Sequence, residues 1–95
     1  MSDHEIIKLP SRFDYSYHQD FLAAYLPALN DPDKVKLILD FSRVEYLDSS
    51  ALGMMVMLQK KFNQVGKVVQ IKSASGATEE ILTMANMQRI FEFIS

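Results

Sequence analysis

The chain contains no cysteine, no tryptophan and only two histidines among its 95 residues. The lack of cysteine excludes disulfides, a thiolate nucleophile and a zinc site built on thiolates. His4 and His18 have no neighbours at metal-ligand spacing. We expect His4 in a disordered N-terminal tip and His18 on a first helical turn, both solvated, and we therefore expect no metal site.

Glycine and proline are also scarce, with three of each in the chain. Neither of the phosphate-binding patterns GxxxxGK[ST] and GxGxxG occurs, and there is no GxSxG nucleophile elbow. With no cysteine and no suitably placed histidine, Ser49 and Ser50 have no obvious general base. Asp48 does not qualify for Ser49, because an immediate neighbour seldom points at a residue from a helix start. We predict that the protein is not an enzyme, with no catalytic residues and no cofactor.

The chain has little excess charge and no long hydrophobic run. Ten basic and twelve acidic residues give a net charge of −2, which argues against a basic face for nucleic acid. The longest apolar run, 51–58, is far shorter than the roughly 20 residues that a bilayer requires. The acidic N-terminus is unlike a signal peptide. We expect a cytoplasmic protein with no nucleic-acid partner and no membrane insertion.

Short apolar runs alternate with segments of helical periodicity. Since 48% of the residues are hydrophobic and two cores in 95 residues would each be too small, we expect one domain over 1–95, with its core at about 5–94. The alternation predicts an α/β fold with a mostly parallel four-stranded sheet and helices packed against it. The predicted strands are 6–9, 35–41, 68–71 and 90–94, and the predicted helices are 17–29, 51–65 and 75–85.

Local signals predict where the first and third helices start and stop. Ser16 and Gln19 have the spacing of a capping box, with Asp14 as a rival N-cap. Pro27 is expected to end or distort the first helix. Asn86 is expected to end the third helix in a left-handed conformation, since asparagine is second to glycine at that position.

The second helix is expected to bury one apolar face against the sheet. The predicted buried set is Leu52, Met55, Val56 and Phe62, facing Leu37, Leu39 and Ile71. Met54 is then the methionine expected to be exposed. Gly53 costs about 1 kcal/mol relative to alanine in a helix. We therefore expect another backbone to approach it closely, from this chain or from a partner.

The most informative segment runs from Asp40 to Gly53, where a buried strand leads into the start of the second helix. Asp48, Ser49 and Ser50 are all good N-cap residues, and a well-capped helix is the plainest interpretation of them. The segment also lies at the carboxyl edge of the predicted sheet, where ligands and partners meet α/β proteins.

Asp40-x-Ser42-x-Val44, followed by Asp48-Ser49-Ser50-Ala51-Leu52-Gly53, resembles the signature of the bacterial anti-sigma factor antagonists, which are STAS domains. Ala51 stands where the family usually has glycine. The segments 9–14 and 75–93 also resemble the family, although Ser11 replaces a usual glycine. The resemblance covers about 5–94 and implies a single STAS domain.

The resemblance implies a binding protein rather than an enzyme. Its partner would be an anti-sigma factor that is a serine kinase with a GHKL-type ATP site. That kinase would phosphorylate Ser49, or as second choice Ser50, and a PP2C-type phosphatase would reverse the modification. The expected partner-binding surface comprises Ser11, Arg12, Asp14, Asp48, Ser49, Ser50, Ala51, Leu52, Gly53 and Met54.

A second hypothesis is a STAS subunit that is never phosphorylated and is bound to the ATPase component of a transporter. A threonine at the first serine position would favour it, whereas Ser49 and its acidic neighbour favour the switch. The resemblance leaves the oligomeric state open.

Overall fold

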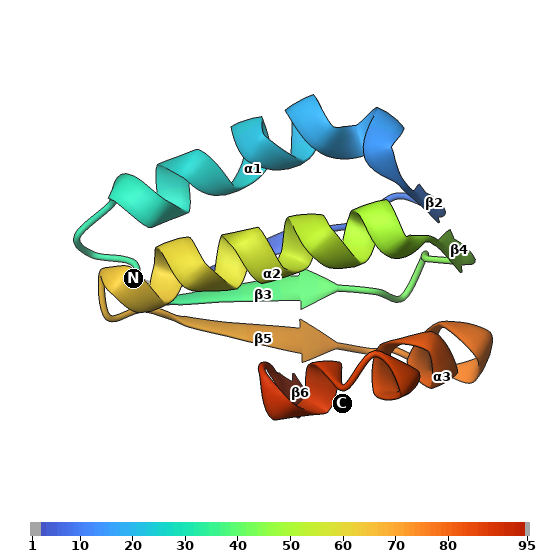
Figure 1. Ribbon diagram of the computed structural model, residues 1–95. Helices are drawn as coiled ribbons and strands as arrows, with labels where there is room; N and C mark the ends of the chain where they lie inside the picture. The colour runs from blue at the N-terminus through green and yellow to red at the C-terminus, as the bar shows by residue number, and fades with distance from the viewer. Residues whose placement is uncertain (1–2, 95) are drawn as a thin grey trace.

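Four parallel strands form the central sheet of the computed structural model, which describes residues 3–94 (Figure 1). Their order across the sheet is β1-β3-β5-β6. The strands are β1 (His4–Lys8), β3 (Lys36–Asp40), β5 (Val68–Lys72) and β6 (Glu92–Ile94). The predicted α/β fold is confirmed. His4 belongs to β1, so the prediction of a disordered tip there was wrong.

The long helices α1 (His18–Asn30) and α2 (Ser49–Gln64) pack on one face of this sheet (Figure 1). The strand register aligns Ile7, Leu39, Ile71 and Phe93 across that face. Leu39 and Ile71 have no exposed surface, whereas Ile6, one residue before Ile7 in β1, is 41% exposed. The edge strand β1 thus has one covered face, whereas the central strand β3 buries four consecutive residues, 37–40.

A second sheet of only two short strands lies beyond the carboxyl ends of β1 and β3. It pairs β2 (Arg12–Phe13) in parallel with β4 (Tyr46–Leu47). Phe13 and Leu47 point into the core from these strands, and both are buried. The pairing fixes the segment after β1 against the segment that leads into α2, and sequence periodicity did not reveal it.

The start of α1 differs from the prediction. A 3₁₀ helix, η1 (Tyr15–Tyr17), comes first, and Asp14 is its N-cap because the Asp14 carboxylate accepts from the Ser16 N–H at 3.0 Å. The predicted capping box was wrong, since Ser16 lies inside η1 and no side chain caps α1. Pro27 does not end the helix, which continues to Asn30.

The buried face of α2 consists of Ala51, Met55, Leu58 and Phe62, which follow the helical period of 3.6 residues. Met55 and Phe62 were predicted correctly. Leu52 and Val56 are only half-buried, so their assignment to the core was wrong. The buried face is therefore rotated from the predicted one, and the outward methionine is Met57 at 53% exposure rather than the half-buried Met54.

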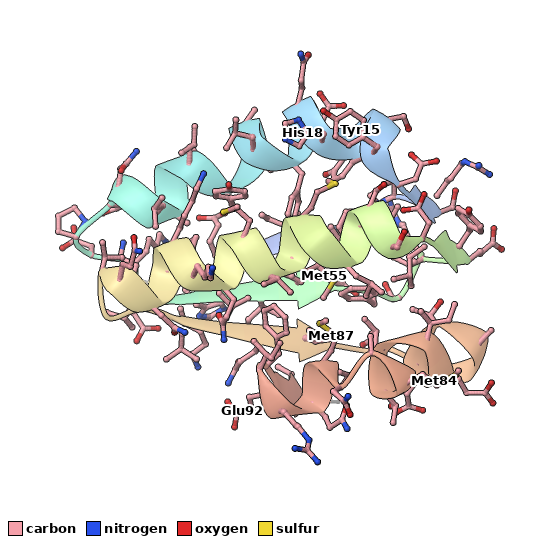
Figure 2. The ribbon with its side chains drawn as sticks, viewed as in Figure 1. Tyr15, His18, Met55, Met84, Met87 and Glu92 are labelled. Atoms are coloured by element: carbon pink, nitrogen blue, oxygen red, sulfur yellow. The ribbon has the colours of Figure 1, made fainter. Side chains whose placement is uncertain are left out.

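The third helix, α3 (Gly76–Met84), ends as predicted. Asn86 has φ 61° and ψ 29°, the left-handed conformation, and it leads into η2 (Met87–Arg89). Met87 is 5% exposed and packs in the core. Figure 2 shows Met55 and Met87 inside the body of the protein and Met84 at its rim. Because η2 precedes it, β6 starts two residues later than predicted.

Candidate functional site

The start of α2 is capped by Asp48. Its backbone is extended, with φ −123°, and its Oδ1 accepts from the Ala51 N–H at 3.0 Å. Among the three cap candidates of the sequence, the structure thus gives this role to Asp48, and the helix begins at Ser49. The side chains of Ser49 and Ser50 do not cap the helix.

Ser49 and Ser50 are both exposed in the first turn of α2. Within residues 3–94, neither hydroxyl has a hydrogen-bond partner. Their backbone N–H groups belong to the first turn, where no carbonyl of the same helix can accept them. Such a position stabilises a nearby anion through its N–H groups and the helix dipole.

The structure brings the Ser11–Asp14 segment next to the strand that precedes α2. The N–H groups of Glu45 and Tyr46 donate to the Ser11 carbonyl oxygen at 2.8 and 3.0 Å. The Arg12 guanidinium lies 4.5 Å from the centre of the Tyr46 ring, a cation–π distance. The Ser11–Asp14 segment and the segment leading into α2, which the sequence predicted to share one surface, are therefore adjacent.

Asp14 is held in its ionised form at the edge of this surface. The Ser16 hydroxyl donates to its carboxylate, and Arg12 Nε donates to it at 2.7 Å. These interactions lower the pKa of Asp14, with Ser16 making the largest contribution and Arg12 the next. An exposed ion pair of this kind adds little stability.

An apolar groove of about 410 Å³ separates α2 from η1 and α1. Its lining is mostly apolar, with Ser50 toward one end and Lys61 toward the other. The rings of Tyr15 and His18 stack 5.0 Å apart at its rim, and Figure 2 shows both on the α1 side of the molecule. The other lining residues are Phe21, Leu22, Tyr25, Gly53, Met54 and Met57.

Sequence analysis had not identified this groove. It had placed Gly53 and Met54 on the partner surface, but not the α1 side or Lys61. The signal available in the sequence was the spacing of Gly53, Met57 and Lys61, four residues apart on one helical stripe. That stripe could be distinguished from the core face only after Met55 and Leu58 had been placed inside.

Gly53 itself is exposed and has open space beside it. A Cβ built on it would meet no other atom within 4 Å. A close approach from elsewhere in the described chain, one of the two explanations for this glycine, was therefore wrong. Of the other proposed partner-binding residues, Leu52 is half-buried and Ala51 lies wholly inside the core.

Residues 3–94 lack two further kinds of feature, a metal-binding cluster and a membrane-spanning helix. No group of three or more His, Cys, Asp or Glu side chains there could hold a metal ion. None of the helices in that range is long and apolar enough to cross a membrane.

The model of the family described as "Mlab, STAS domain" matches residues 1–94. The chain belongs to this STAS-domain family. A STAS-domain containing protein of Pseudomonas aeruginosa (strain UCBPP-PA14) is 31% identical over 86 residues, which are 90% of this chain and 83% of that protein.

Solved STAS structures share the fold at low identity. The anti-sigma factor antagonist SpoIIAA of Bacillus, in its unphosphorylated form, has a TM-score of 0.76 and 16% identity, covering 100% of this chain and 83% of the other. Its phosphorylated form has a TM-score of 0.73 and 14% identity, over 100% and 86% of the two chains.

The STAS domain of a SulP transporter from Vibrio cholerae has a TM-score of 0.76 and 15% identity. It covers 99% of this chain and 75% of the other. This STAS domain is therefore similar in fold both to an anti-sigma factor antagonist and to the STAS domain of a SulP transporter.

Proposed function

We propose that this STAS domain is a regulatory binding protein whose partner-binding surface surrounds the start of α2 and is switched by phosphorylation of Ser49. One observation carries the proposal. Ser49 is exposed at the first position of a helix that Asp48 already caps. Its hydroxyl can therefore be modified without removing an interaction on which the fold depends.

Ser49 is preferred over Ser50 because the resemblance of the Asp48-Ser49-Ser50 segment to the anti-sigma factor antagonist motif implies that Ser49 is the phosphorylated serine. SpoIIAA, which has the same fold, has been solved with and without phosphate. Ser50 is one residue further into the helix and lines the groove. A phosphate there would stand at the groove mouth, so Ser50 remains the second choice.

A phosphate on Ser49 adds a charge of about −1.5 to −2 and three acceptor oxygens. The first-turn N–H groups of α2 stabilise that anion, so the domain stays folded. The adjacent Asp48 is acidic as well, and together the two groups repel an acidic partner surface. A partner that binds the unmodified helix start is released.

The partner that this arrangement suits is an anti-sigma factor that is itself a serine kinase of the GHKL type. A PP2C-type phosphatase would reset the switch. The alternative is a STAS subunit that stays bound to a transporter's ATPase component and is never phosphorylated. A threonine at position 49 would favour that alternative, whereas the serine that is present favours the switch.

The first test is the intact mass of the protein purified from its own cells, followed by phosphosite mapping. The switch predicts a fraction that is heavier by about 80 Da, the mass of one phosphate, located on Ser49. A protein that is never modified on Ser49 or Ser50, in growth and in starvation, favours the constitutive subunit.

The second test is calorimetric titration of the cognate kinase with variants. Ser49→Ala should bind like the unmodified protein, and Ser49→Asp should bind roughly 10- to 100-fold more weakly, which corresponds to about 1.4–2.8 kcal/mol. Ser75→Asp is the matched control, since Ser75 is an exposed serine at the start of α3. Equal affinity of all three variants would refute the switch.

A further inference from the structure

The groove between α1 and α2 contains a cation that its surroundings do not neutralise. Lys61 lines the groove and is half-buried. Its Nζ lies 3.1 Å from the Tyr25 hydroxyl oxygen and 5.6 Å from the centre of the Tyr25 ring. Within residues 3–94, no carboxylate forms an ion pair with this ammonium group.

The end of the groove at Lys61 can bind a carboxylate with two donors. An ammonium group has three N–H donors, and Tyr25 accepts from one of them. Because the Tyr25 oxygen accepts that bond, its own proton remains available to donate. Charge-assisted hydrogen bonds from such a pair are stronger than neutral ones.

The rest of the groove is shaped for an apolar body. Met54 and Met57, flexible side chains that adapt to irregular ligands, line it from α2, and Phe21 and Leu22 line it from α1. The eight residue steps from Gly53 to Lys61 extend about 12 Å along the helix. The absence of a side chain at Gly53 keeps the far end open. A volume of about 410 Å³ falls within the usual range of ligand pockets.

We propose that this groove binds a single-chain carboxylate amphiphile, a fatty acid, with its head at Lys61 and Tyr25 and its chain directed toward Gly53. One cation with no carboxylate partner among residues 3–94 selects one anionic head group, and the mainly apolar surface of the remaining lining selects an apolar tail. This inference does not depend on the switch at Ser49, since the purified, unmodified protein suffices to test it.

The test is calorimetric titration with dodecanoate below its micelle concentration, with dodecanol as the uncharged comparison. Dodecanoate should bind saturably at one site, and dodecanol roughly ten-fold more weakly. Lys61→Met, which keeps an unbranched apolar side chain, should lose about ten-fold in dodecanoate affinity and no longer distinguish the two ligands.

Gly53→Leu should abolish binding by filling the far end, and circular dichroism should show that the helix is retained. Lys60→Met is the matched control, since Lys60 is the exposed neighbour of Lys61 and does not line the groove. Absence of saturable dodecanoate binding would overturn the proposal. Unchanged dodecanoate affinity in Lys61→Met or in Gly53→Leu would also overturn it.

Discussion

The ammonium group of Lys67 donates to the carbonyl oxygen of Ala28 at 2.6 Å, which joins the loop before β5 to the last turn of α1. It also donates to the Asp31 carbonyl oxygen at 2.6 Å. The last four carbonyls of a helix have no partner within that helix, and a cation is favourable at this end of the helix dipole. Lys67 is only 9% exposed, so water replaces it poorly.

Lys67→Met should therefore lower the free energy of unfolding by about 2 kcal/mol, because it keeps the aliphatic stem and removes hydrogen bonds from a charged donor. Urea denaturation monitored by circular dichroism measures the change. Lys60→Met, on the exposed side of α2, should stay within about 0.5 kcal/mol of the wild type. If the two variants unfold at the same urea concentration, the Lys67 contacts do not stabilise the fold.

Phe62→Ala should destabilise the protein by about 3–5 kcal/mol, because the side chain is fully buried and its removal leaves a cavity. The Phe62 ring also packs edge-on against Tyr25, with centroids 6.1 Å apart. Met57→Ala, on the outward face of the same helix, should change stability by less than about 1 kcal/mol. Thermal melts of the two variants would show similar midpoints only if the buried face of α2 had been assigned wrongly.

The main strands and helices could be predicted because each repeats a pattern over many residues. The strand 35–41 and the helix 51–65 each bury several side chains at a fixed period. The β2–β4 pair could not be predicted, since two residues per strand form no period. Its partners, such as Phe13 and Leu47, are far apart in the sequence.

The candidate site could be predicted only in part, because part of it is formed by residues that are far apart in the sequence. A local motif located Asp48, Ser49 and Ser50, and it required no knowledge of the fold. The groove needs α1 and α2 side by side, and Tyr25 and Lys61 meet across 36 positions. Its cationic end therefore became visible only in three dimensions.

Asn86→Ala should destabilise the protein by about 1–2 kcal/mol, the cost of placing an ordinary residue in the left-handed conformation that Asn86 adopts at φ 61°. Asn86→Gly should be near neutral, because glycine adopts that conformation without strain. Chemical denaturation of the pair gives the comparison. A similar loss in both variants would show that the asparagine side chain, rather than the backbone, matters.

The free energy of unfolding should decrease at acidic pH partly because the Asp40 carboxylate becomes protonated. The Ser42 N–H donates to this carboxylate at 2.9 Å and, as the largest cause, lowers the pKa of Asp40 below its ordinary value of 3.8. The Ser42 hydroxyl, Lys72 and Lys8 act in the same direction, and burial opposes them. Because the pKa of Asp40 is lower in the folded than in the unfolded protein, the carboxylate stabilises the fold at pH values above its pKa in the unfolded state. This contribution is lost as the pH falls through its pKa in the folded state.

Asp40→Asn should therefore be less stable than the wild type at about pH 7, and the gap should narrow as the pH falls below about 4. Urea midpoints measured across this range give the two curves. If the difference in stability between Asp40→Asn and the wild type stays constant down to about pH 2, this carboxylate is excluded as a source of the acid sensitivity.

Gly53→Ala should raise stability and weaken partner binding together. A Cβ at Gly53 meets no atom within 4 Å, so alanine should gain about 1 kcal/mol of helix propensity without a clash. Gly66→Ala makes the same chemical change where φ is +75°, and it should instead destabilise the protein by about 1–2 kcal/mol. Urea denaturation should show that the free energy of unfolding rises in Gly53→Ala and falls in Gly66→Ala.

The affinity of Gly53→Ala for the proposed partner then shows whether or not partner contact requires a glycine at position 53. If the proposed kinase partner approaches the helix start closely there, Gly53→Ala should bind it roughly ten-fold more weakly although the fold of the variant is more stable. Gly66→Ala, at the other end of α2, should bind like the wild type at temperatures where it is folded. A Gly53→Ala variant that is more stable and binds unchanged would show that the glycine is not required for partner contact.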